Sequence, residues 1–155
     1  MPPHPSLSHP AQQQQIAARV AVVTPVTPAR WGRMNSLEML CHLTEAFRLV
    51  LKERPTSRRR SLLRNAAGRY LALRSPLPWA HGYPTLPALD MKRTGVPDVG
   101  FEDKRNELVA LLVRFSAATP QELLAEHPIF GPMTFEEWMI WGYRHTDHHL
   151  RQFGC

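Results

Sequence analysis

The sequence predicts an all-α protein, most simply a four-helix bundle with an inserted short helix and a long loop rich in proline and glycine. Apolar residues recur every three or four positions in four separate segments, which is the period of an amphipathic helix. No segment shows the alternation of a β-strand, and there is neither an internal repeat nor a glycine-rich phosphate loop. A chain of 155 residues can build one core, so we expect a flexible tail over residues 1–10 and a single domain over residues 11–155.

The first two helices are predicted at residues 11–23 and 36–53. In the first, aliphatic residues recur at helical spacing until Pro25 ends the helix. The second begins after Asn35, whose side chain can cap the helix together with Glu38 three residues later. Its broad apolar face comprises Leu37, Leu40, Leu43, Phe47, Val50 and Leu51.

The middle of the chain is predicted as a basic helix over residues 58–74 and a long loop over residues 76–100. The apolar side chains of the helix are Leu62, Leu63, Tyr70 and Leu71. A structureless loop of this length is uncommon in a compact domain and is often functional. Two interpretations stay open for its ring-bearing side chains, which either cover a pocket or only anchor the loop. These side chains are Trp79, His81 and Tyr83.

Two long helices and a short one complete the predicted fold. Residues 102–117 form a helix, and residues 121–126 add one or two turns. The last helix begins at Thr134, where Glu137 three residues later completes a capping box, and Gly154 supplies its stop. The inward residues of the first of these helices are Leu108, Leu111, Leu112 and Phe115.

The net charge of the chain is +6, and its excess is concentrated in one stretch. Nucleic-acid sites for single strands interleave basic side chains with aromatic ones. Few aromatic residues accompany the basic ones here, so a solvated basic surface is favoured and no nucleic-acid partner is expected. The arginines of this stretch are Arg54, Arg58, Arg59, Arg60, Arg64, Arg69 and Arg74.

The lack of targeting signals and the small number of cysteines predict a cytoplasmic protein with no membrane partner. No apolar run reaches eighteen residues, and the N-terminus lacks the basic start and apolar centre of a signal peptide. Cys41 and Cys155 are too few for a disulfide framework, and neither belongs to a CxxC motif.

Three of the eight histidines lie within five residues on the last predicted helix. His145 and His149 are one turn apart on a face that also carries Trp138 and Trp141, so both imidazoles can approach one divalent metal. Spacing alone leaves two interpretations open. The pair either binds a metal or packs as neutral, hydrogen-bonded histidines in a core or interface.

A further histidine, His42, lies on a different predicted helix at the edge of its apolar face. Glu38 and Glu45 stand about one turn to either side. A boundary histidine between two carboxylates suits a metal ligand whose ring is oriented by its neighbours. A solvated edge of Glu, His and Glu is the alternative.

Several short motifs together resemble the DinB/YfiT-like superfamily of metal-dependent helical bundle proteins, in particular a branch of unknown function. The resemblance runs from about residue 11 to the C-terminus and implies a four-helix bundle. It also implies that His42, His145 and His149 bind a divalent metal, whereas His148 does not. The motifs are Trp31-Gly-Arg-Met34, Met39-Leu-Cys-His-Leu43, Pro78-Trp79, Phe130-Gly-Pro-Met-Thr134, Glu137-Trp138 and His145-Thr-Asp-His-His-Leu-Arg-Gln152.

The resemblance also implies a class of chemistry. Members with assigned activity are similar to thiol-dependent S-transferases and to a thiol-dependent isomerase, which use low-molecular-weight bacterial thiols. We therefore expect zinc or nickel as the metal, a thiol cosubstrate and a small-molecule substrate, and the frequent dimers among relatives suggest a homodimer. Arg151 stands where many relatives have glycine, so no detailed substrate analogy is carried over.

Three hypotheses follow, because three imidazole ligands leave an open coordination position on the metal. In the first, the metal activates a thiol for transfer to an electrophile. In the second, metal-activated water hydrolyses a small substrate with Glu38 or Glu45 as the general base. The third is a non-enzymatic metal-binding or interaction module, which the absence of an identifiable nucleophile or triad favours.

Overall fold

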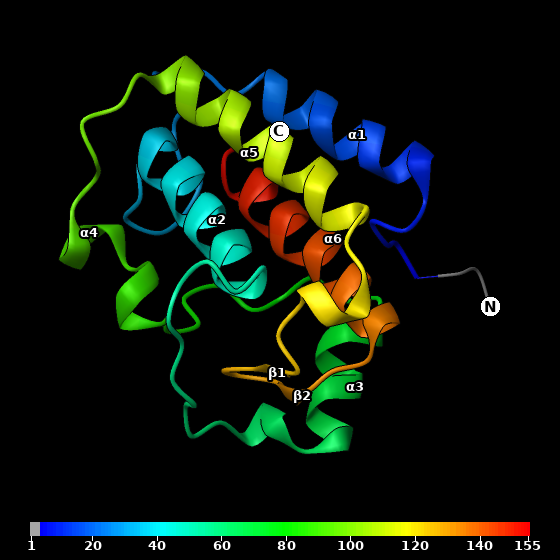
Figure 1. Ribbon diagram of the computed structural model, residues 1–155. Coiled ribbons are helices and arrows are strands. Elements are labelled where there is room, and N and C mark those ends of the chain that lie inside the picture. Colours follow the sequence, from blue (N-terminus) through cyan, green and yellow to red (C-terminus); the bar gives the residue numbers. More distant parts are fainter. Residues whose placement is uncertain (1–3) are drawn as a thin grey trace.

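A computed structural model describes residues 4–155, and over this range the protein is all-α apart from one small hairpin. Four helices pack side by side as a bundle, with α2 and α1 against α5, and α1 also against α6 (Figure 1). This agrees with the predicted fold class. The four helices are α1 (Pro10–Ala21), α2 (Ser36–Val50), α5 (Phe101–Ser116) and α6 (Phe135–Gln152).

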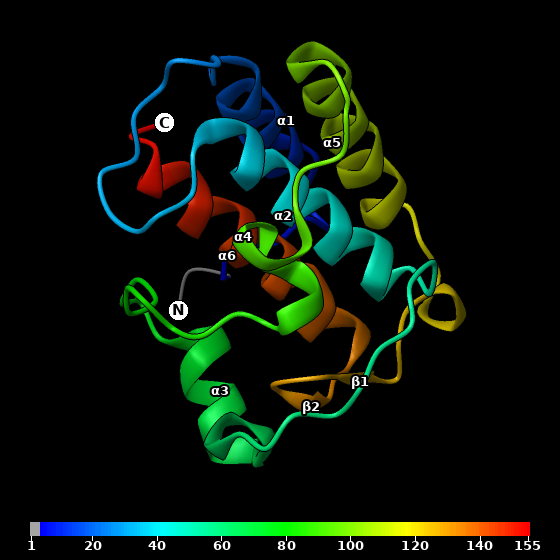
Figure 2. The same cartoon turned by 90° about the vertical axis from the view of Figure 1, so that its left-hand side faces the viewer.

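Shorter elements lie at one end and along one side of the bundle. The helix α3 (Ala66–Arg74) follows a 3₁₀ turn η1 (Leu62–Arg64) and packs near the hairpin of β1 (Glu126–His127) and β2 (Gly131–Pro132) (Figure 1). A second 3₁₀ turn, η2 (Pro87–Leu89), leads into α4 (Met91–Thr94), which lies against α2 (Figure 2). A third, η3 (Pro120–Glu122), follows α5. None of the helices in the described residues is long and apolar enough to cross a membrane.

The capping residues of α2 and α6 form as the sequence predicts. The Asn35 side chain accepts from the Glu38 amide, and the Glu38 carboxylate accepts from the Asn35 amide. Thr134 and Glu137 make the same reciprocal pair at the start of α6. Each box satisfies two amides that would otherwise lack partners. The boxes therefore fix the residue at which each histidine-bearing helix begins.

The core lies between α2, α5 and α6 and is rich in aromatic rings. Phe47, Phe115 and Trp141 meet edge to face, with ring centroids 5.0 to 6.1 Å apart. Gly142 allows this close approach, because a Cβ atom there would lie 2.6 Å from Cε1 of Phe115 and 2.9 Å from Cδ1 of Leu7. A larger residue at this position would therefore force the Phe115 and Leu7 side chains to shift.

Part of the predicted N-terminal tail contributes to this core. Residues 1–3 lie outside the described residues, but Leu7 is only 1% exposed, and its amide donates to the Met139 carbonyl over 3.1 Å. The Ser6 amide donates to the Gln12 side chain. Ser6 and Leu7 are thus buried and Leu7 is bonded to α6, which the proline-rich composition did not indicate.

The basic stretch differs from the single helix predicted over residues 58–74. Residues 55–61 have no helical structure, and α3 begins only after Asn65, whose side chain caps the Gly68 amide. The Arg59 amide donates instead to the Pro128 carbonyl, and Arg64 pairs with Glu126 over 2.8 Å. These contacts to the hairpin replace helical hydrogen bonds.

The apolar side chains of the predicted helix are largely outside the core. Leu62 is 90% exposed, and Tyr70 and Leu71 are also exposed, whereas Leu73 is the buried residue of α3. The prediction of one helix over residues 58–74 was wrong, because α3 begins only at Ala66, after a segment without helical structure and the turn η1. The arginines here serve in large part as structural anchors.

Candidate metal centre

Three histidines from two helices meet inside the bundle. His42 projects from α2, and His145 and His149 project from successive turns of α6. One ligand atom from each ring lies within 4.8 Å of the others, and Nε2 of His42 is 3.2 Å from Nε2 of His145. His42 and His149 are buried and His145 is half-buried. The structure therefore contains a three-histidine cluster that can hold a metal ion.

The orientation of His42 is set by a backbone carbonyl. Its Nδ1 donates to the Leu89 oxygen over 2.9 Å, because a carbonyl oxygen can only accept. Leu89 is the last residue of η2, within the segment predicted as a long loop. Nε2 of His42 consequently carries the lone pair and faces His145. Contrary to the sequence-based expectation, the partner of His42 is Leu89 rather than Glu38 or Glu45.

Both of those carboxylates have other partners. Glu38 completes the α2 capping box with one oxygen, and its other oxygen lies 2.8 Å from the Lys92 ammonium. Burial alone would raise the pKa of Glu45, but hydrogen bonds from Arg54 and Arg48 lower it, so this carboxyl remains ionised. Neither residue belongs to the histidine cluster found among the described residues. Their role as general base stays a prediction.

His149 is oriented by a relay of two hydrogen bonds. The side-chain nitrogen of Gln152 donates to the Trp31 carbonyl over 2.9 Å, which turns the Gln152 oxygen toward His149. Nδ1 of His149 donates to that oxygen over 2.9 Å. Gly32 leaves room for the amide, because a Cβ atom there would lie 2.6 Å from Nε2 of Gln152. The lone pair of His149 is thus on Nε2, as in His42.

His145 has a different environment. Its Nδ1 is buried and has no hydrogen-bond partner. Its ring packs against Trp141, with centroids 5.0 Å apart, and against both other histidines of the cluster. His42 and His149 each donate Nδ1–H to an oxygen, so each has its lone pair on Nε2. A neutral His145 ring has one N–H, which can donate to only one of these two lone pairs. Without a cation, at least one Nε2 lone pair of the cluster therefore lacks a donor, which is unfavourable in a buried site.

The buried environment keeps the three rings neutral. Burial lowers the pKa of His42, and it lowers the pKa values of His145 and His149 well below the ordinary value. Protonation of His145 or His149 would also place its positive charge beside other histidines, and this repulsion lowers the pKa values of both further. Neutral imidazole is the form that binds metals, so the folded protein presents these ligands without first having to remove a proton.

A second layer of rings lies outside the cluster. The Trp31 and His81 rings stack with centroids 3.8 Å apart and an angle of 8° between their planes. His148 lies between this stack and Trp79, with its ring centroid 5.9 Å from each tryptophan ring. Trp79 also approaches His145 at 6.1 Å. Trp79 anchors the loop, because its Nε1 donates to the Ala72 carbonyl over 2.7 Å, whereas His81 and Tyr83 are both exposed.

Comparison of the chain with protein-family models, with curated proteins and with solved structures finds no match. The three histidine rings nevertheless have a defined geometry.

That geometry suits a divalent metal. Nitrogen ligands at the zinc distance of 2.0–2.1 Å in a tetrahedral site are about 3.3 Å apart, close to the separation of the His42 and His145 nitrogens. The acceptors Leu89 and Gln152 provide the oriented hydrogen bonds that ligating imidazoles usually make. Gln152 had a signal in the sequence, since it stands three residues after His149 on one helix. The Leu89 carbonyl had none.

Proposed function

We propose that His42, His145 and His149 bind a divalent metal, zinc or nickel, and that the protein is a metal-dependent S-transferase for a low-molecular-weight thiol. The observation that carries the metal proposal is the pair of oriented rings. His42 and His149 each donate Nδ1–H to an oxygen, which leaves both Nε2 lone pairs for one cation. Both donors come from buried side chains, so water competes little for the site.

Three imidazoles leave room for an exogenous ligand, which is typical of catalytic rather than structural zinc sites. When bound, such a metal lowers the pKa of a thiol or water in the open position. The half-buried His145 lies on the side of Trp79 and His148, so a small molecule would approach from this side. The aromatic rings there would exclude bulk water and favour a neutral or apolar electrophile.

Thiol transfer is preferred over hydrolysis because the motifs around the three histidines resemble the DinB/YfiT-like superfamily, whose assigned members use thiols. A second consideration agrees with this preference. Hydrolysis calls for a general base, and the carboxylates closest in sequence to His42 are held by Lys92, Arg48 and Arg54.

Elemental analysis of the purified protein tests the metal site. We expect about one equivalent of metal in the wild type and in His148→Ala, and its loss in His42→Ala, His145→Ala and His149→Ala. His148 is the matched control, because it lies next to a proposed ligand and shares its residue type. Equal metal content in all five proteins, or none in any, would contradict the proposal.

Turnover assays then test the chemistry. The metal-loaded protein is offered a panel of bacterial thiols with a small electrophile, and separately small esters and amides without thiol. Thiol-dependent product that disappears in His145→Ala supports S-transfer. Thiol-independent hydrolysis supports the hydrolase instead, and full metal loading with no turnover supports a binding module.

A further inference from the structure

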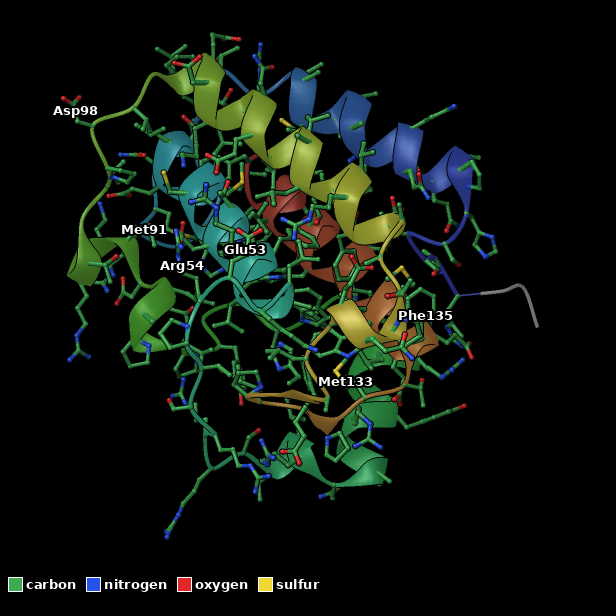
Figure 3. The ribbon with its side chains drawn as sticks, in the orientation of Figure 1. Glu53, Arg54, Met91, Asp98, Met133 and Phe135 are labelled. Atoms are coloured by element: carbon green, nitrogen blue, oxygen red, sulfur yellow. The ribbon has the colours of Figure 1, made fainter. Side chains whose placement is uncertain are left out.

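A pocket of a different character lies along α2, on a neighbouring face from the histidines. A pocket of about 370 Å³ opens between α2, α4 and the start of α5, lined by residues from all three and by Arg54. Figure 3 shows Met91 and Arg54 close together on this side of the molecule. The volume is within the range of pockets that hold small molecules. None of the three clustered histidines lines it.

The most unusual wall residue is Lys104. Its side chain is buried, with the whole residue 4% exposed, and its ammonium group meets the Glu107 carboxylate at 2.6 Å. An ammonium group has three donors, and this is the one hydrogen bond that Nζ makes to the described residues. A buried charge is costly unless it is fully paired. Two N–H donors therefore remain for a group that occupies the pocket.

Lys104 is the most buried cation of a larger network of ion pairs. A connected network of ion pairs joins the cations Arg48, Arg54, Lys104 and Arg114 to the carboxylates Glu45, Glu53 and Glu107. Four positive groups thus face three negative ones. Glu45 also lines the pocket, but Arg48 and Arg54 together occupy both of its oxygens. Arg54 and Arg114 are partly exposed, so water solvates their charges, whereas the buried Lys104 ammonium would meet an anion that enters the pocket.

The remaining walls are mainly apolar. Ala88, Met91, Val96 and Pro97 line the pocket, and the Cys41 thiol, 1% exposed, forms part of its wall. Burial raises the pKa of Cys41, so the thiol stays protonated and behaves as a small apolar group. A ligand that matches these walls carries one anionic group and a short apolar body.

We propose that this pocket binds a short-chain organic carboxylate, with the carboxylate at Lys104 and the hydrocarbon chain against Met91 and Val96. The inference does not depend on the proposed function, because no metal ligand takes part. The pocket and the histidine cluster do share the η2 segment, in which Ala88 lines the pocket and Leu89 holds His42. An occupant of the pocket would therefore lie beside the segment that orients one histidine.

Butyrate is the probe, and binding to the full-length protein is measured by two-dimensional amide NMR and by calorimetry. We expect saturable binding, with the largest shifts at the Gly95 and Val96 amides. Butyramide, which has the same shape without the charge, and inorganic phosphate, which has charge without the chain, should bind at least about tenfold more weakly. If butyramide or phosphate binds as well as butyrate, or if the shifts lie elsewhere, the proposal fails.

Variants keep the test independent of folding. Lys104→Met should weaken butyrate binding about tenfold or more, whereas Lys92→Met, the same change on neighbouring α4, should leave it unchanged. Lys104→Met also removes the buried partner of Glu107 and can therefore destabilise the fold. Ala88→Phe is the second variant. It fills the pocket from an exposed position without touching the ion pairs and should abolish binding. Unchanged butyrate binding in folded Ala88→Phe would overturn the assignment.

Discussion

The Gln152 side-chain oxygen lies 2.9 Å from Nδ1 of His149, and the nitrogen of the same amide donates to the Trp31 carbonyl. This relay fixes both the tautomer and the direction of the His149 ring. Gln152→Leu keeps the size of the side chain but removes the acceptor, so His149 loses its orientation. We expect metal affinity to fall about 10–100-fold, measured by competition with a coloured chelator.

Arg151→Leu is the control for that variant. Arg151 is the adjacent, exposed residue of α6, and its side chain pairs with Asp147 rather than with the cluster. Its replacement should leave metal affinity unchanged. An equal loss of affinity in both variants would show that the Gln152 effect reflects the end of α6 rather than the hydrogen bond.

Gly32 supports the same relay from the opposite side. It has a φ of +79°, and an added Cβ would collide with the Gln152 amide. Gly32→Ala should therefore lower metal affinity and destabilise the fold, whereas Gly82→Ala should show only the backbone strain of about 1–2 kcal/mol. Gly82 has a similar φ of +75° and no neighbour within 4 Å of the added atom. Chelator competition and thermal unfolding separate the two effects, and a Gly32→Ala protein with wild-type affinity would exclude this role.

Local signals explain why part of the fold was predictable. The starts of α2 and α6 depend on side chains three residues apart, so Asn35 with Glu38 and Thr134 with Glu137 are visible in the sequence. The turn spacing of His145 and His149 is local in the same sense. That His42 joins them rested on resemblance, because contact between two helices is not encoded in either one alone.

The contacts that were missed are long-range or made by the backbone. The Leu89 carbonyl that orients His42 has no side-chain signature, since every residue carries the same group. The burial of Leu7 depends on the space beside Gly142, 135 positions later in the chain. In the basic stretch, the apolar residues recur at helical spacing, but the chain is not α-helical before Ala66. Contacts with the hairpin, such as the ion pair of Arg64 with Glu126, replace helical hydrogen bonds there.

Glu38, one of the two carboxylates near His42, gives a prediction about the stability of the fold rather than about metal binding. Glu38→Ala removes the capping box of α2 and the partner of Lys92, so we expect a loss of about 1 kcal/mol in unfolding free energy at unchanged metal content. Glu38→Gln can still accept the Asn35 amide and should be milder. Chemical denaturation and elemental analysis measure the two properties. Metal loss in folded Glu38→Gln would instead place this carboxylate at the metal centre.

His127 makes the fold sensitive to acid. Burial, together with the nearby positive charge of Arg64, lowers its pKa to about 3, and its Nδ1 accepts from the Ile129 and Phe130 amides. In the unfolded chain the ordinary pKa of about 6.5 applies, so the unfolded state binds the proton first. Stability is therefore lost as the pH falls below about 6.5, by about 1.4 kcal/mol per pH unit from this residue, until the folded pKa is reached.

His127→Asn isolates this contribution, because its side-chain oxygen can accept the same amides but does not titrate. Denaturation of the metal-free wild type and variant between about pH 7 and pH 5 should show a shallower decline in the variant. The other histidines contribute equally to both proteins. Parallel stability curves would mean that His127 is not the residue responsible.

The outer rings predict how quickly metal can leave the centre. Trp31 and His81 come from segments 50 positions apart, and their stack adjoins His148, whose ring centroid lies 5.1 Å from that of His149. Trp31→Ala removes the ring but keeps the carbonyl that holds Gln152. We expect unchanged metal content and a faster release of metal to a chelator in this variant.

His81→Ala should accelerate metal release similarly, and the double variant should add little more, because both changes break the same Trp31–His81 stack. Tyr83→Ala, in the same loop but outside the stack, should release metal at the wild-type rate, and equal acceleration there would indicate general loosening of the loop instead.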